Sequence, residues 1–286
     1  MERNDKAAIE ALLKRHGFHF SKSMGQNFLI DPAIPYEIAE SSRANEQNGV
    51  LEIGPGIGAL SHELCERAGK VVAVELDRAL LPVLAETMAP YPNVEVVPGD
   101  VLKLDLTAIA AEKFQGLTPI VCANLPYSVT SPLLAAFIEA RCFERITVMI
   151  QREVALRICA APGSSDYGAF SVFCQYHTQP ELLFEVGPEC FLPAPKVTSA
   201  VIHCRSRKAP PVEVCSREML FRTVRAGFAL RRKTLVNSLQ TAFPLPKERL
   251  TEIVAACGLD PSVRGERLGL AEYARLADAL AAEKEG

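Results

Sequence analysis

The chain has 286 residues, of which 49% are hydrophobic and 23% are charged. This composition is ordinary for a globular protein and excludes a disordered, collagen-like or coiled-coil chain as a whole. The length exceeds that of a typical single domain and predicts two domains. The formal net charge of −3 at pH 7, taken alone, argues against a nucleic-acid partner.

The start of the chain, from Met1 on, carries no apolar run, so the sequence predicts no secretory signal and a cytoplasmic protein. The longest stretch without a charge, residues 114–138, is long enough to span a bilayer. Pro119, Pro126 and Pro132 interrupt it. We therefore interpret this stretch as a buried strand, a loop and a helix, and expect no membrane segment.

Five hydrophobic runs of strand length begin 21 to 26 residues apart, and the intervals between them show the apolar spacing of helices. Within each run the apolar residues are continuous, which is typical of parallel strands covered on both faces. This pattern predicts a doubly wound, Rossmann-like α/β domain. The runs are Val50–Ile53, Val71–Leu76, Val94–Val97, Ile120–Ala123 and Ile146–Ile150.

The pattern changes after the fifth run. Two further strands are predicted at Leu182–Val186 and Val197–Cys204, and they are compatible with an antiparallel edge of the same sheet. A proline-containing linker at residues 208–211 follows. We predict a first domain over residues 1–207 and a small all-helical C-terminal domain over residues 208–286. Its helices are expected at Met219–Leu230, Lys233–Phe243, Lys247–Cys257 and Ala271–Ala282.

The basic residues are concentrated in one segment. Between Arg205 and Lys233, nine basic residues stand against two acidic ones, a net +7 that leaves −10 for the rest of the chain. Such a block attracts phosphate backbones, although a solvated helix face has the same composition.

The nine cysteines lie at least eleven positions apart, and the five histidines form no cluster. This spacing fits neither a zinc site nor a compact disulfide framework. We predict no metal site and assign no catalytic histidine.

Three glycines, Gly54, Gly56 and Gly58, follow the first predicted strand and precede a helix. Glycines at such a turn let the backbone approach a ligand, which is typical of a nucleotide-type pocket. Glu75 and Asp100 follow the next two strands, where they can accept hydrogen bonds from ribose hydroxyls and an exocyclic amine. Two acids with few bases nearby favour S-adenosylmethionine, which has a sulfonium and no phosphate. Ordinary turns that cap helices are the alternative, and the loop alone also fits a dinucleotide fingerprint.

The tetrapeptide Asn124-Leu125-Pro126-Tyr127 follows the fourth strand, at the edge where α/β sheets bind substrates. It offers an amide oxygen, a backbone carbonyl fixed by proline, and an aromatic ring. An adenine taken out of its stack needs these three groups, because its amine donates to Asn124 and to the Leu125 carbonyl while Tyr127 stacks on its face.

With these motifs the chain resembles the small-subunit ribosomal RNA adenine dimethyltransferases, the KsgA/RsmA family, over nearly its whole length. Leu230 stands where a glutamine is expected before the basic triplet. The motifs that carry the resemblance are Gly25-Gln26-Asn27-Phe28-Leu29, Glu52-Ile53-Gly54-Pro55-Gly56, Val74-Glu75-Leu76-Asp77, Gly99-Asp100-Val101, Asn124-Leu125-Pro126-Tyr127, Phe191-Leu192-Pro193-Ala194-Pro195-Lys196-Val197-Thr198-Ser199, Arg231-Arg232-Lys233-Thr234-Leu235 and Arg264-Gly265-Glu266-Arg267-Leu268.

The resemblance implies a Rossmann-like S-adenosylmethionine methyltransferase domain and a helical RNA-binding domain. It implies dimethylation of the N6 amines of two adjacent adenosines in the 3′-terminal hairpin of 16S rRNA, in the small ribosomal subunit or its precursor, with a role in subunit maturation. We expect a monomer. By resemblance, the cofactor-binding residues are Asn27, Leu29, Gly54, Glu75, Asp100 and Asn124.

The residues expected to act on the adenine are Asn124, Leu125, Tyr127 and Phe191. Phe191 is a candidate for a second stacking wall, although an aromatic residue in a proline-rich loop also serves as a packing plug. Arg231, Arg232 and Lys233 are expected to bind rRNA phosphates and set the register.

Three other functions compete with this interpretation. A resistance-type methyltransferase acting on large-subunit rRNA shares the fold, but usually has isoleucine at the position of Leu125. An assembly protein that checks ribosome maturation does not need the intact tetrapeptide. A nucleotide-dependent oxidoreductase would leave both the tetrapeptide and the basic segment unexplained.

Overall fold

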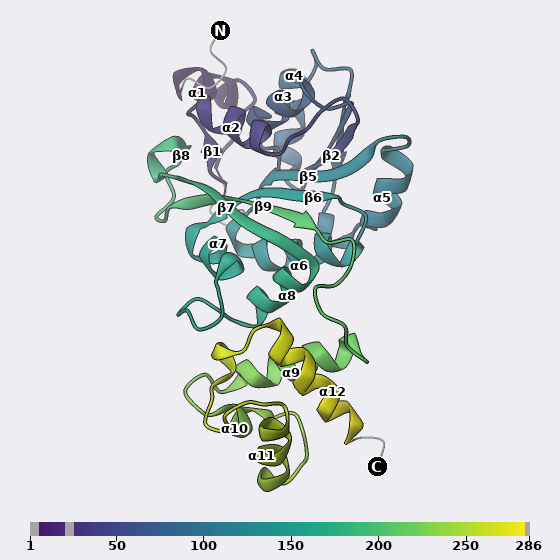
Figure 1. The fold of residues 1–286 in the computed structure, drawn as a ribbon. Helices are drawn as coiled ribbons and strands as arrows, with labels where there is room; N and C mark the ends of the chain where they lie inside the picture. Colours follow the sequence, from purple (N-terminus) through teal and green to yellow (C-terminus); the bar gives the residue numbers. More distant parts are fainter. Residues whose placement is uncertain (1–5, 21–25, 284–286) are drawn as a thin grey trace. The chain divides into compact units, whose positions relative to one another are not determined.

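The computed structural model describes residues 6–20 and 26–283 (Figure 1). The start of the chain, on which the prediction about a secretory signal rests, and Gly25 of the first motif lie outside the described residues. The chain forms two compact units, one from residues 1–155 and 179–206 and the other from residues 156–178 and 207–286.

A seven-stranded sheet with the order β4-β3-β2-β5-β6-β9-β7 forms the centre of the first unit. The pairs from β4 to β6 are parallel, and β9 runs antiparallel to β6. The predicted Rossmann-like sheet with an antiparallel edge is thereby confirmed. The strands are β2 (Asn48–Ile53), β3 (Lys70–Glu75), β4 (Val94–Pro98), β5 (Thr118–Asn124), β6 (Arg145–Gln151), β7 (Thr178–Val186) and β9 (Ser199–Ser206).

Helices cover both faces of this sheet, which is why its central strands are mostly apolar. Figure 1 shows α2 and α3 on one side and α6 on the other. Ile38 of α2 and Leu64 of α3 are buried with Val50 and Met149 of the sheet. The helices that start in this unit are α1 (Lys6–Arg15), α2 (Ala33–Ser41), α3 (Ala59–Cys65), α4 (Leu81–Thr87), α5 (Leu106–Lys113), α6 (Thr130–Ala140) and α7 (Arg152–Cys159).

The charge-free stretch at residues 114–138 contains β5, a loop and most of α6, as the sequence predicts. Among the described residues, no helix is both long and apolar enough to cross a membrane.

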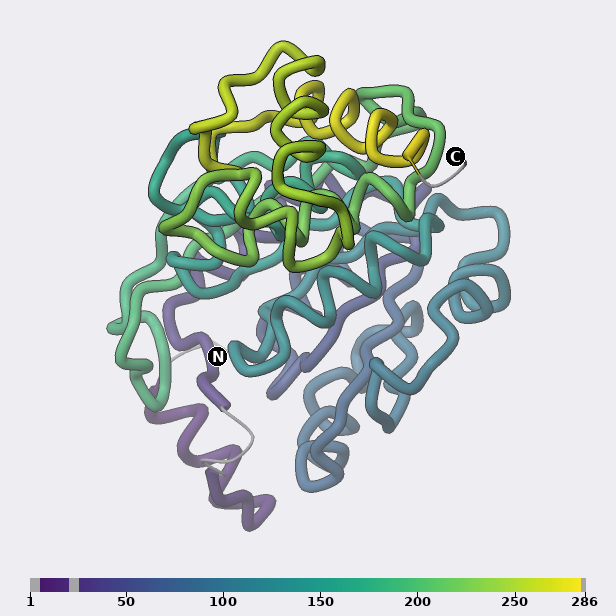
Figure 2. Tube along the Cα trace, turned by 90° about the horizontal axis from the view of Figure 1, so that it is seen from below, coloured from purple at the N-terminus to yellow at the C-terminus, as the bar shows by residue number. Residues whose placement is uncertain are grey.

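A second, two-stranded sheet joins distant parts of the chain. In it, β1 (Phe28–Leu29) pairs antiparallel with β8 (Phe191–Leu192). Figure 2 shows the green segment that carries β8 beside the purple N-terminal segment. The sequence pattern did not predict this sheet, because two residues are too few for a periodic signal.

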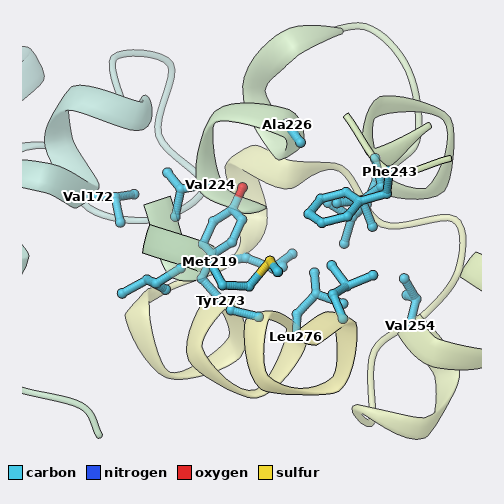
Figure 3. Close-up of a cluster of buried hydrophobic side chains, with 14 of the residues drawn as sticks. Val172, Met219, Val224, Ala226, Phe243, Val254, Tyr273 and Leu276 are labelled. Carbon is cyan, nitrogen blue, oxygen red and sulfur yellow. The ribbon is translucent and has the colours of Figure 1, made fainter. Parts of the chain in front are cut away.

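The second unit is helical, and its core is formed by side chains from several helices (Figure 3). Val172, Met219 and Tyr273 are among the buried members of this core. Gly227 and Gly265 let the backbone come close to Tyr273, whose hydroxyl donates to the Gly265 carbonyl at 3.0 Å. The helices are α8 (Ala169–His177), α9 (Arg217–Ala229), α10 (Leu235–Leu239), α11 (Lys247–Ala256) and α12 (Leu270–Ala282).

Two expectations about this unit differ from the structure in their boundaries. The segment 156–178, which the sequence analysis assigned to the first domain, belongs to the second unit because Tyr167, Val172 and Tyr176 are part of the helical core. The helix expected over residues 233–243 is only α10, since residues 231–233 and 240–242 form turns and a bend around it.

Candidate cofactor and substrate site

A cavity of about 370 Å³ opens at the carboxyl ends of the parallel strands in the first unit. The polypeptide reaches this edge after β2, β3, β4 and β5, because parallel strands end on the same side of a sheet. The residues expected to bind the cofactor or act on the adenine all line it: Asn27, Leu29, Gly54, Glu75, Asp100, Asn124, Leu125, Tyr127 and Phe191.

The glycine loop after β2 is part of the cavity lining. Gly54 and Gly56 have φ values of +64° and +62°, a conformation that favours glycine. A Cβ on Gly56 would lie 3.1 Å from the Phe28 ring. The loop therefore needs glycine for its backbone conformation and for the close approach of Phe28.

Glu75 ends β3 and lies against this loop. Its Oε2 accepts a hydrogen bond from the Gly56 amide at 3.3 Å, and its Oε1 accepts one from the Asp77 amide at 2.8 Å. Burial raises the pKa of the Glu75 carboxyl, and the amide donors oppose this rise. These contacts fix the carboxylate at the cavity wall.

Asp100 follows β4, where it both caps a helix and lines the cavity. Its Oδ1 accepts a hydrogen bond from the Leu102 amide at 3.1 Å and so caps the short 3₁₀ helix Val101–Lys103. Its Oδ2 lies 3.7 Å from Nζ of the exposed Lys103. The same residue lines the cavity.

The loop after β5 carries the tetrapeptide. The Leu125 amide donates to the Met149 carbonyl of β6 at 3.0 Å, and the Leu125 side chain is buried. Pro126 is extended, with φ −58° and ψ 129°. Its carbonyl accepts hydrogen bonds from the Val129 amide and the Thr130 hydroxyl, both at 3.2 Å. The backbone of this loop is therefore fixed at both ends.

The two aromatic residues of the site differ in exposure. Tyr127 is partly buried, and its hydroxyl lies 2.6 Å from the Ser199 hydroxyl. Phe191 is only 3% exposed, because it packs with Leu29, Val186 and Val201 in the core under β1 and β8. It nevertheless lines the cavity.

Glu52 is a cavity residue that the sequence analysis did not single out as part of the site. It is 2% exposed, is the next-to-last residue of β2, and its Oε2 is buried without a hydrogen-bond partner. Burial raises the pKa of the Glu52 carboxyl to about 8, and the neighbouring Glu75 adds to the rise. The available signal was an ionisable residue inside the otherwise apolar run Val50–Ile53.

The lining of the cavity is acidic. Glu52, Glu75 and Asp100 contribute carboxyl groups, whereas no lysine, arginine or histidine is among the described lining residues. A pyrophosphate would find no cation on this wall, but a small cationic ligand would find the carboxyl groups of Glu75 and Asp100, while the high pKa of Glu52 keeps that group largely uncharged at neutral pH. Within the part of the chain that the structure describes, no group of His, Cys, Asp or Glu is arranged to hold a metal ion.

The basic triplet lies in the second unit, in the turn before α10, and all three side chains are exposed. Arg231 is engaged within this unit, since its Nε lies 3.4 Å from Glu266 Oε2 and its guanidinium donates to the Ser165 carbonyl. No ion pair of Arg232 or Lys233 is found among the described residues, which leaves these two cations to the solvent.

Comparison with protein families gives a match over residues 17–281 to the family described as ribosomal RNA adenine dimethylase. The chain belongs to this family. It is therefore an enzyme, a methyltransferase acting on adenine in ribosomal RNA, and the family and the fold imply the use of S-adenosylmethionine.

Curated relatives agree with this family. The chain is 46% identical over 272 residues to ribosomal RNA small subunit methyltransferase A of Alkaliphilus oremlandii, covering 94% of this chain and 95% of that protein. It is 47% identical over 274 residues to the protein of the same name from Geobacillus thermodenitrificans, covering 94% of each.

Solved structures of the dimethylase fold are also similar. The 23S rRNA methyltransferase ErmE is 27% identical, with a TM-score of 0.67 over 89% of this chain and 99% of that chain. A dimethyladenosine transferase from Plasmodium falciparum has a TM-score of 0.72 at 23% identity, over 87% of this chain and 95% of that chain, and supports the fold.

Proposed function

We propose that this dimethylase transfers methyl groups from S-adenosylmethionine to the N6 amines of two adjacent adenosines in the 3′-terminal hairpin of 16S rRNA. One observation carries the proposal: the acidic cavity and the Asn124-Leu125-Pro126-Tyr127 loop form one continuous site. The relatives from Alkaliphilus and Geobacillus, both named for the small subunit, support that choice of RNA.

The acidic half of the cavity suits the cofactor. S-adenosylmethionine supplies an electrophilic methyl group on a positively charged sulfur and carries no phosphate. We assign its binding to six residues that line the cavity: Asn27, Leu29, Gly54, Glu75, Asp100 and Asn124. Glu75 would accept hydrogen bonds from the ribose hydroxyls of the cofactor. Asp100 would accept one from the exocyclic amine of the cofactor's adenine.

The other half suits an adenine taken out of its stack. The Asn124 side-chain oxygen and the Leu125 carbonyl would accept the two N–H groups of the target amine. Two acceptors favour a more tetrahedral nitrogen, whose lone pair then points at the methyl group. Tyr127 and Phe191 would hold the ring between them.

Catalysis in this scheme comes mainly from positioning. The methylated nitrogen is cationic and acidic, so its proton can leave to solvent after the transfer. None of the residues needs to act as a general base.

We assign the rRNA phosphates to the second unit. The exposed cations Arg231, Arg232 and Lys233 would contact the RNA backbone and set its register without reading bases. We place the enzyme in the cytoplasm as a monomer that acts on the small subunit or its precursor and takes part in its maturation.

The decisive experiment is transfer of labelled methyl from S-adenosylmethionine to small ribosomal subunits isolated without this modification. The labelled nucleoside is then identified and mapped. We expect dimethyladenosine at two adjacent positions near the 3′ end of 16S rRNA. Label in large-subunit RNA would assign the chain to the resistance-type activity, and tight binding without transfer would indicate an assembly factor.

A further inference from the structure

The hydroxyl of Ser199 lies where it can fix the aromatic ring that we assign to the target base. Ser199 is fully buried at the start of β9, and its hydroxyl lies 2.6 Å from the Tyr127 hydroxyl. Tyr127 belongs to the loop after β5, whereas β9 lies beyond β6 in the sheet. The bond therefore reaches across β6 and joins the loop after β5 to the start of β9.

The position of Ser199 is itself rigid. It is the Cα partner of Gln151 in the antiparallel β6–β9 ladder, and the next residues of β9, Ala200 and Val201, are fully buried. The preceding Thr198 accepts a hydrogen bond from the Arg152 amide at 3.0 Å. These contacts hold the backbone of Ser199, so its hydroxyl meets the end of the Tyr127 side chain from a fixed part of the sheet.

The geometry of tyrosine explains what the bond does. The phenolic oxygen lies on the axis through Cβ and the ring, so rotation about χ2 does not move it. Anchoring this oxygen fixes the direction of the ring axis, which χ1 would otherwise change. The loop backbone is already held through the Pro126 carbonyl, so the Ser199 bond fixes the ring axis and leaves only the rotation of the ring plane about χ2.

The hydroxyl of Tyr127 is not needed for stacking, since a phenylalanine ring offers the same face. Burial raises the pKa of the Tyr127 phenol above its ordinary value, which is already well above neutral pH, so the hydroxyl keeps its proton there. The hydrogen bond to Ser199 therefore affects the position of the ring and not its ability to stack on the base.

We infer that Ser199 is a positioning residue for methyl transfer, which holds the Tyr127 ring at the place where the target adenine stacks. This inference rests on the proposed function, because it takes Tyr127 as the stacking residue. It adds a residue outside the tetrapeptide, contributed by the antiparallel edge of the sheet.

The test compares Ser199→Ala, Tyr127→Phe and the double variant in single-turnover and steady-state transfer to unmodified small subunits. We expect each single variant to lower kcat about threefold to tenfold, the effect of one hydrogen bond, with cofactor affinity unchanged. The double variant should lose no more than either single variant, since all three lack the same bond.

Ser206→Ala is the matched control. Ser206 lies at the other end of β9 and its hydroxyl donates to the Phe143 carbonyl at 2.6 Å, away from the cavity. It should change thermal stability without changing kcat. If Ser199→Ala does not fold, Tyr127→Phe removes the same bond from the partly exposed partner and tests the inference alone.

The outcomes separate this inference from the proposed function. Wild-type kcat in Ser199→Ala and Tyr127→Phe, or losses that multiply in the double variant, would overturn the role of Ser199. With either of these results, Tyr127→Ala should still abolish methyl transfer if the Tyr127 ring stacks on the base. Full transfer by Tyr127→Ala would instead overturn the stacking role on which the inference depends.

Discussion

Leu29 and Phe191 are Cα partners in the antiparallel ladder between β1 and β8. Through this pairing, a residue assigned to the cofactor and a residue assigned to the target base share one backbone scaffold. The Ile30 amide, which donates to the Cys190 carbonyl at 2.9 Å, extends the connection. A change at Phe191 that displaced this backbone would therefore affect both halves of the cavity, whereas one that kept its buried volume would affect mainly the half that we assign to the base.

We predict that Phe191→Leu lowers kcat about tenfold, because leucine keeps most of the buried volume but removes the ring that stacks on the base. Cofactor affinity should remain within about threefold. Transfer assays together with calorimetric cofactor titration would measure both. A variant with full kcat and a lower Tm would show that Phe191 acts as a packing plug alone.

Asn124→Ala is expected to lower kcat by at least about 100-fold, because the target amine loses one of its two acceptors at the reacting nitrogen. Cofactor binding should be at least partly retained, since the remaining cavity wall is intact. Equilibrium binding and single-turnover transfer would separate the two effects. Asn45→Ala, an exposed substitution outside the cavity, is the control. Full activity of Asn124→Ala would refute the role.

Replacing Arg231, Arg232 and Lys233 by alanine is expected to weaken RNA binding and flatten its dependence on salt, because fewer counterions are released. Arg232 and Lys233 should carry most of the effect, since Arg231 is held by Glu266 and the Ser165 carbonyl. Their double variant should lower the log–log salt slope by about 1.5 to 2.

Filter binding at several salt concentrations would measure these slopes. Arg249→Ala is the matched control in the second unit, because Arg249 is paired with Glu252 and Glu283 on the surface. An unchanged slope in the triple variant would assign the phosphate contacts to other residues.

The buried Glu52 predicts a dependence of stability on pH. Its folded pKa of about 8 lies above the ordinary value of 4.5, so the native state holds a proton that the unfolded chain has released between these values. The contribution of this proton to the free energy of unfolding is fully present below pH 4.5. It is lost as the pH rises from 4.5 to about 8.

Glu52→Gln should remove this loss. Between pH 5 and 8, the free energy of unfolding measured in urea should fall less steeply with pH for Glu52→Gln than for the original chain. The difference in slope should be on the order of 1 kcal/mol per pH unit. Glu37→Gln, an exposed substitution on α2, should follow the original chain. Parallel curves for the original chain and Glu52→Gln would contradict the prediction.

The sequence predicted the sheet and its functional edge because both depend on local patterns. Continuous apolar runs indicated buried parallel strands, and the residues that follow such strands share one edge. Gly54, Glu75, Asp100 and Asn124 were therefore expected to lie together, and the structure places them around one cavity. Their individual roles stay predictions.

Other features depended on contacts between residues far apart in the chain. The pairing of β1 with β8, the bond from Tyr127 to Ser199 and the engagement of Arg231 by Glu266 leave no periodic signal in the sequence. The same is true of residues 156–178, whose apolar side chains are shared with α9 and α12 in one core. Local patterns determine which elements form, whereas side-chain packing between distant segments decides which of them are held together.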